Sequence, residues 1–179
     1  MKKIDPALLM GKRIFLREMT ERDAPYLVSW RNDPEIKKWL FRQETLTVSD
    51  HIHWFKKNKP DRVDYIICDK EAKKPIGTVN YINISEKEAE AGKMLGDKSY
   101  WGGGYAKEAF KIWLTIGFEV FGFEKIKVKT MLANNNNIGL NKKLGFIDTG
   151  QTKIQISPGN VKEVLIMEIN KRAFYEKKF

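Results

Sequence analysis

Three successive glycines separate a strand-like pattern from a strongly apolar helical pattern, and this segment restricts the fold more than any other. Residues 101–104 read Trp-Gly-Gly-Gly, the strand pattern covers 88–95, and apolar residues recur at helical spacing over 106–118. Glycines at a helix entrance let several backbone N–H groups converge on one ligand, and the helix dipole favours a negative one. The segment predicts a site for an anion such as a pyrophosphate, with a ligand-free glycine turn as the alternative. It is not a P-loop, because no Gly-Lys-Ser/Thr follows, and Lys107 stands where the dinucleotide fingerprint has its last glycine.

Strand-like and helical patterns share the rest of the chain. Strands are expected at 13–19, 65–68, 76–84, 88–95, 125–131, 146–156 and 161–169, and helices at 20–30, from 34, from 47, over 106–118 and over 137–144. No repeat or linker interrupts this order, and 179 residues fit one domain. The sequence predicts a single domain over residues 1–179, of the mixed α/β (α+β) class around one sheet.

The composition points to a cytoplasmic protein without a membrane partner. The only cysteine, Cys68, excludes an internal disulfide and fits a reducing compartment. No stretch approaches the roughly 20 apolar residues that cross a bilayer. The first residues carry two lysines without a long apolar run behind them, so we expect no signal peptide.

The net charge of +10 is spread along the chain. Basic residues outnumber acidic ones by 13 to 8 in residues 1–60 and by 11 to 5 in 121–179, whereas residues 61–120 hold 9 basic and 10 acidic residues. This distribution contains no dense basic tract, and no zinc-finger spacing is present. A diffuse positive field favours an anionic small molecule over nucleic acid as the partner.

No metal site is expected. His51 and His53 are two residues apart in a helical pattern, so their side chains point about 200° apart and cannot hold one ion together. Cys68 lies in a strand pattern and is expected in the core rather than at a reactive site.

Two motifs resemble those of the GNAT acetyltransferases. Residues 91–109 look like motif A of that family, in the branch that includes ribosomal-protein N-terminal and spermidine acetyltransferases. Farther on, Asn134 opens a helical pattern that ends in Lys143-Leu144-Gly145-Phe146, as in the family. The resemblance implies a mostly antiparallel sheet of about seven strands, splayed between the fourth and fifth strands and flanked by helices. It also implies an N-acetyltransferase that uses acetyl-CoA, in which the amine attacks the thioester directly.

The resemblance also implies which residues bind the cofactor. The main chain at the end of the strand would bind the pantetheine arm, the loop amides would bind the pyrophosphate, and Asn134 would bind the pantetheine or acetyl region. The cofactor-binding residues expected in this way are Met94, Leu95, Gly96, Trp101, Gly102, Gly103, Gly104, Tyr105, Ala106 and Asn134.

The catalytic groups follow less directly from the resemblance. Many family members have a tyrosine that protonates the departing thiolate, and Asn141 occupies that position here. Water or another tyrosine, such as Tyr105, is then needed as the acid. Glu90 matches an acidic family position and is a candidate general base, with a solvated strand carboxylate as the alternative. Glu90 and Asn134 are the catalytic candidates, while Glu108 is expected to have a surface or capping role.

The first helices are expected to bind the acceptor amine. Their sequence resembles N-acetyltransferases of nucleotide-linked amino sugars, at the candidate substrate-binding residues Trp30, Arg31, Asn32, His51 and Phe55. Aromatic rings offer stacking faces and arginines can bind a diphosphate, although the same aromatic residues fit a core equally well. The acceptor is predicted to be a small anionic amine; a protein N-terminal acetyltransferase and a non-catalytic acyl-CoA-binding module are the alternatives. A homodimer is compatible with this prediction.

Overall fold

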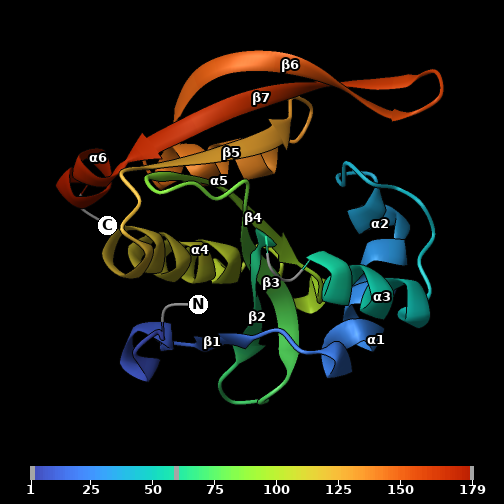
Figure 1. Ribbon diagram of the computed structural model, residues 1–179, viewed down its shortest axis with the longest axis horizontal. Coiled ribbons are helices and arrows are strands. Elements are labelled where there is room, and N and C mark those ends of the chain that lie inside the picture. The colour runs from blue at the N-terminus through green and yellow to red at the C-terminus, as the bar shows by residue number, and fades with distance from the viewer. Residues whose placement is uncertain (1–2, 59–60, 178–179) are drawn as a thin grey trace.

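One seven-stranded sheet organises the computed structural model, which describes residues 3–58 and 61–177 (Figure 1). The strands are β1 (Ile14–Glu18), β2 (Val63–Asp69), β3 (Pro75–Ile82), β4 (Glu88–Leu95), β5 (Lys125–Met131), β6 (Ile147–Ser157) and β7 (Asn160–Asn170). Their order across the sheet is β1-β2-β3-β4-β5-β7-β6. Only the β4–β5 pair is parallel among the described strands, and the others are antiparallel. The predicted mixed, mostly antiparallel fold is confirmed.

Helices cover both faces of the sheet. The α-helices are α1 (Ala24–Asn32), α2 (Pro34–Lys37), α3 (Val48–Asn58), α4 (Tyr105–Ile116), α5 (Asn135–Lys143) and α6 (Lys171–Glu176). The short helices are η1 (Pro6–Leu9), η2 (Glu21–Asp23), η4 (Lys98–Tyr100) and the π-helical η5 (Gly117–Phe121) that extends α4. Figure 1 shows α4 on one side of the sheet and α1, α2 and α3 on the other. No described helix has the length and apolarity to span a bilayer.

The two faces of β4 belong to two separate cores, because side chains alternate along a strand. Ala89 and Ala91 lie in the larger core beneath α4, together with Phe110 and Trp113. Met94 packs on the opposite side against the smaller core of α1 and α3. A substitution on β4 therefore affects the layer of α4 when its residue number is odd and the layer of α1 and α3 when it is even.

The sheet opens between β4 and β5. These strands pair only from Glu88↔Lys125 to Glu90↔Lys127, although each is at least seven residues long. In contrast, β5 pairs with β7 along its whole length, from Lys125 to Met131. The second half of β4 therefore has no strand partner on its β5 side. The splay expected between the fourth and fifth strands is confirmed, and it ends beside the glycine loop.

Candidate functional site

The glycine loop enters α4 through left-handed backbone conformations. Gly102 has φ 77° and Gly104, the N-cap of α4, has φ 80°. Glycine reaches this region at little cost, whereas a side chain there is strained. Residues 101–104 are exposed, and the first amides of a helix have no acceptor within it. The loop therefore presents backbone donors, aided by the dipole of a 12-residue helix, where an anionic group can reach them.

Arg13, which precedes β1, adds a fixed positive charge to this loop. Its Nη1 donates to the Gly103 carbonyl at 2.8 Å, and its guanidinium lies 4.1 Å from the centre of the Tyr105 ring. Glu108 holds it from α4 by accepting from the Arg13 amide at 2.7 Å and from Nε at 2.9 Å. The Arg13 contacts hold the pKa of Glu108 below its ordinary value, against the opposing effect of burial. Glu108 thus positions a cation at the N-terminal end of α4, in addition to the surface or capping role expected for it.

Trp101 ties the loop to the end of β4. Its indole Nε1 donates to the Leu95 carbonyl at 2.9 Å. The Gly96 amide donates to the Ile76 carbonyl at 2.9 Å, so this N–H is directed at β3 rather than at the opening. Gly96 also lies so close to Trp30 that an added Cβ would fall 2.0 Å from the indole. The strand end and the loop are therefore fixed relative to one another before any ligand binds.

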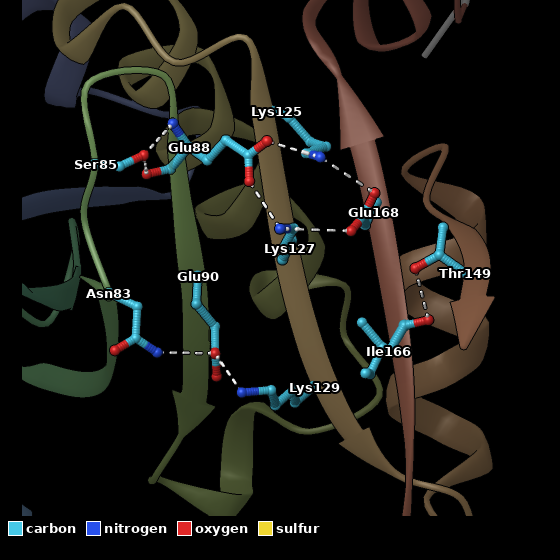
Figure 2. Close-up of polar contacts among 10 residues, drawn as sticks. All are labelled: Asn83, Ser85, Glu88, Glu90, Lys125, Lys127, Lys129, Thr149, Ile166 and Glu168. Carbon is cyan, nitrogen blue, oxygen red and sulfur yellow. Dashed lines mark hydrogen bonds and ion pairs between the residues drawn. The ribbon is translucent and has the colours of Figure 1, made fainter. Parts of the chain in front are cut away.

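Glu90 lies where β4 and β5 begin to separate. Its Oε2 accepts from Lys129 Nζ at 2.8 Å and from Asn83 Nδ2 at 3.1 Å (Figure 2). Two residues earlier, Glu88 is bound to Lys125 and Lys127, each at 2.7 Å, where the strands are still paired. Both glutamates lie on the same side of β4, and the Glu90 side chain is only 15% exposed. Glu90 is thus a half-enclosed carboxylate at the edge of the opening.

The opposite face of the opening holds a lysine and an asparagine in contact. Lys93 Nζ donates to Asn141 Oδ1 at 2.6 Å and lies 4.1 Å from the centre of the Phe110 ring. Asn141, fully buried in α5, donates through Nδ2 toward Thr130 Oγ1 at 3.3 Å. Burial lowers the pKa of Lys93 to about 7. A lysine whose pKa is lowered by burial therefore links β4 to α5.

A cavity of about 820 Å³ lies between α2 and the β5–β7 end of the sheet. Its lining comprises Lys38, Trp39, Met131, Leu132, Ala133, Lys153, Val161, Lys162 and Glu163. Three of these residues are lysines and one is a carboxylate. The cavity adjoins the end of β5 and is lined by Ala133, the residue before Asn134 in the chain. It is a basic space beside the expected acyl end of the cofactor site.

The sequence matches the model of a known protein family over most of its length. The profile described as acetyltransferase (GNAT) domain matches residues 13–147. The chain belongs to the GNAT acetyltransferase family. Two relatives are each 28% identical: protein MJ1062 of Methanocaldococcus jannaschii over 143 residues, and the N-acetyltransferase p20 of Bacillus licheniformis over 176 residues. The match spans 76% of this chain but only 28% of MJ1062, and 93% of this chain and 97% of p20.

Solved GNAT structures share the fold. Spermidine N-acetyltransferase from Vibrio cholerae, in complex with CoA and spermine, superposes with a TM-score of 0.83 at 19% identity, covering 92% of this chain and 99% of that one. Ribosomal-protein-S5-alanine acetyltransferase from Vibrio fischeri gives 0.77 at 19% identity, covering 90% and 94%. At such identities the likeness shows the architecture alone.

In this GNAT chain the residues predicted to bind the acceptor lie largely inside the protein. Trp30, 8% exposed, and Phe55, 5% exposed, belong to the smaller core. Asn32 closes a loop by donating to the Leu46 carbonyl at 2.8 Å and accepting from its amide at 3.0 Å. His51 is buried, and its pKa is lowered by burial and by the Arg31 charge. These side chains pack beneath the surface of α1 and α3 and hold the adjoining loop. Their contact with the acceptor stays a prediction.

Arg31 differs from these neighbours because its charge is poorly compensated. Its buried Nε has no hydrogen-bond partner among the residues that the structure describes. Burial lowers the pKa of Arg31, and the charges of Arg42 and Arg62 lower it further, with only Glu44 acting in the other direction. Arg62 is already paired with Asp64 through two hydrogen bonds of 2.5 and 2.6 Å, so an added anion here would stabilise chiefly Arg31.

Asn134 caps α5 rather than pointing freely into the site. Its Oδ1 accepts from the Asn137 amide at 3.1 Å, as expected for an N-cap.

Sequence reasoning missed Arg13 and Lys93 as site residues. Arg13 has no signal in the sequence, because its partner is 95 residues away. Lys93 has one: it continues the Ala89, Ala91 face of β4, where a charge is out of place in a core.

Proposed function

We propose that this GNAT chain transfers an acetyl group from acetyl-CoA to a primary amine by direct attack on the thioester. The observation that carries the proposal is the separation of β4 from β5 after Glu90, directly beside the left-handed glycines at the start of α4. An unpaired strand edge suits a peptide-like pantetheine arm, and the helix entrance suits a pyrophosphate. Both features lie in one continuous segment of chain.

The residues of the site divide the work. The amides of Gly102, Gly103 and Gly104 hold the pyrophosphate, with Arg13 as a neighbouring cation. Acetyl-CoA supplies an activated thioester carbonyl. Glu90 accepts the proton that the attacking ammonium loses, directly or through water. The strand edge aligns the two reactants, which is the main source of rate in such a transfer.

The acceptor that the charge distribution favours is an anionic small molecule, with a nucleotide-linked amino sugar as the leading candidate. Lys38, Lys153 and Lys162 face a cavity with a single carboxylate, and the chain carries a net charge of +10. The Vibrio cholerae neighbour was solved with spermine, a polycation. A polycation would meet repulsion from the lysines in this cavity, whereas phosphates would be attracted.

A thiol-release assay with acetyl-CoA tests the proposal across four amine classes: a nucleotide-linked amino sugar, a peptide with a free N-terminus, a polyamine and an aminoglycoside. We expect the highest kcat/KM for the anionic amine. Faster turnover of the peptide would replace the acceptor assignment with N-terminal protein acetylation. CoA binding without turnover of any amine would indicate a binding module and overturn the enzyme assignment.

Arg31→Ala sharpens the acceptor assignment. Because Arg31 carries an under-compensated charge, its loss should raise KM for a nucleotide-linked amino sugar much more than for the same sugar without its nucleotide. The KM for acetyl-CoA serves as the internal control. Equal effects on both sugars would remove Arg31 from the acceptor site and leave it a structural residue.

A further inference from the structure

Acyl transfer from a thioester leaves a thiolate that needs a proton or a compensating charge. The α5 position at which many family members have a tyrosine acid is Asn141 here, and its amide cannot donate a proton as an acid. The structure shows, however, what Asn141 binds. Its Oδ1 accepts from Lys93 Nζ at 2.6 Å, a shorter distance than most neutral hydrogen bonds.

Lys93 lies at the height of the opening. It stands three residues beyond Glu90, the last β4 residue paired with β5, and Thr130 stands three residues beyond Lys127 on the other strand. Asn141 contacts both, because its Nδ2 donates to Thr130 Oγ1 at 3.3 Å. Lys93 therefore spans the space between the two strands on the α4–α5 face.

Asn141 is held so that its oxygen must face the lysine. Its Nδ2 is directed at Thr130 and lies 3.7 Å from Met167 Sδ, and the whole residue is buried. The Thr130 hydroxyl is fixed in turn by Asn137 Nδ2 at 3.1 Å. This network orients the amide oxygen toward β4 and so aims the ammonium of Lys93.

Charged groups on the surrounding elements are engaged elsewhere. Glu90 pairs with Lys129 on the opposite face of β4, Glu108 with Arg13 on α4, and Lys142 with Asp148 on α5. The other charged groups on these elements and on β7 are Glu88 with Lys125, Lys127 and Glu168, and the exposed Lys107, Lys111, Lys143, Lys162 and Glu163. Among the described residues, none forms an ion pair with Lys93. Its charge is thus balanced by one amide oxygen and one aromatic face.

We propose that Lys93, aimed by Asn141, is the group that protonates the thiolate released in the acetyl transfer. The proposal rests on the proposed function. As the amine nitrogen bonds to the carbonyl carbon, the carbon–sulfur bond breaks and its electron pair goes to sulfur. Lys93 Nζ gives one proton to that sulfur and becomes a neutral amine, which regains a proton from solvent. The nitrogen of the attacking ammonium loses two protons on the way to the amide, one before it attacks and one as the carbon–sulfur bond breaks. Both leave to solvent through Glu90, directly or through water, and because Lys93 takes one proton back the reaction releases one proton in total.

The depressed pKa of Lys93 suits this role. A lysine in water holds its proton too tightly to give it up readily near pH 7, whereas a pKa of about 7 matches the donor to the working pH. The protonated form is required, so the contribution of Lys93 is present below pH 7 and is lost as the pH rises above it. A lysine that merely ties β4 to α5 predicts no such dependence.

The test uses CoA itself as the probe, with thiolate absorbance of the protein-bound CoA followed against pH. The bound thiol and Lys93 titrate as a coupled pair, in which a thiolate stabilises the ammonium and the ammonium favours the thiolate. The thiolate should therefore appear at least about one pH unit lower in the wild-type chain than in Lys93→Met. Lys142→Met removes an exposed lysine that follows Asn141 on α5 and pairs with Asp148; it is the matched control and should titrate as wild type does. In parallel, Lys93→Met should lower kcat about 10²-fold at pH 7 and remove the alkaline decline of kcat.

Lys93→Arg separates the charge from the proton. Arginine keeps the cation but cannot release a proton, so it should preserve the shifted thiol titration while leaving kcat low. Identical thiol titrations in the wild type and Lys93→Met, with CoA still bound, would overturn this assignment and leave the acetyltransferase proposal intact. A wild-type chain that binds no CoA would overturn both.

Discussion

The part of the molecule proposed to bind the cofactor (β4, α4, β5 and α5, here the cofactor half) and the part proposed to bind the acceptor (α1, α2 and α3, here the acceptor half) differ in which atoms form their candidate binding groups. In the cofactor half the candidate binding groups are largely backbone amides, exposed by glycines with φ 77° and 80°. In the acceptor half the candidate groups are side chains, and Trp30 and Phe55 among them are buried in a core. A main-chain site leaves a glycine signature in the sequence. A side-chain site uses residue types that a core also uses, so its signature is ambiguous.

The two halves meet at Gly96. Its backbone lies against the Trp30 indole, and Met94 packs into the same small core. Trp30 therefore supports the end of β4 from the acceptor side. This packing gives Trp30 a structural role at the junction, and its predicted contact with the acceptor stays a prediction.

The largest predicted effect concerns Glu90, a side chain in the cofactor half. It would show that this half does not act through backbone amides alone. If Glu90 is the general base, Glu90→Gln should lower kcat about 10²-fold or more at neutral pH. The loss arises because glutamine cannot accept the proton, while its amide still fits the space beside Lys129 and Asn83. Steady-state kinetics with acetyl-CoA and the best acceptor measure it.

Glu88→Gln is the matched control for that substitution. Glu88 lies on the same face two residues earlier, and its partners Lys125 and Lys127 are strand residues where β4 and β5 are still paired (Figure 2). We expect kcat within about twofold of wild type, because such partly exposed ion pairs contribute little. An equal loss of kcat in the two variants would mean that Glu90, like Glu88, only forms ion pairs between β4 and β5. The general base would then remain unidentified.

A smaller effect is expected on CoA binding, and it tests whether the backbone of the glycine loop binds the cofactor. Gly104→Val places a β-branched side chain at φ 80°, at the entrance of α4, and should raise the CoA dissociation constant at least tenfold, about 1.4 kcal/mol. Gly122→Val imposes the same left-handed strain at the other end of the helix, also at φ 80°. Isothermal titration with CoA should detect the change in Gly104→Val alone. A comparable loss in both variants would attribute the effect to α4 stability rather than to the loop.

The sequence was informative where one local pattern determines the structure. The bounds of β4 and the start of α4 follow from hydrophobic period and glycines, and the observed strand covers the predicted 88–95. Arg13 and Glu108 meet only after the sheet forms, so their contact leaves no local pattern. The replacement at Asn141 was visible, but its partner Lys93 lies 48 residues earlier and becomes evident only in three dimensions. Long-range pairs of this kind account for most of what sequence reasoning missed.

The smallest predicted effect concerns the basic cavity of the acceptor side. Lys153→Gln and Lys162→Gln should each raise KM for an anionic acceptor roughly two- to fivefold, because an exposed lysine contributes at most about 1 kcal/mol to such an interaction. Salt should reduce the difference in KM between variant and wild type, since exposed charges are screened.

Lys87→Gln is the control for these two variants. Lys87 is an exposed lysine paired with Glu124 outside the cavity lining, and its substitution should leave KM unchanged. If all three variants behave alike, the net charge of the chain attracts the acceptor and the cavity does not bind it. A salt-sensitive change confined to Lys153 and Lys162 would place the acceptor between α2 and the β6–β7 end of the sheet, so that side chains outside the acceptor half also bind it.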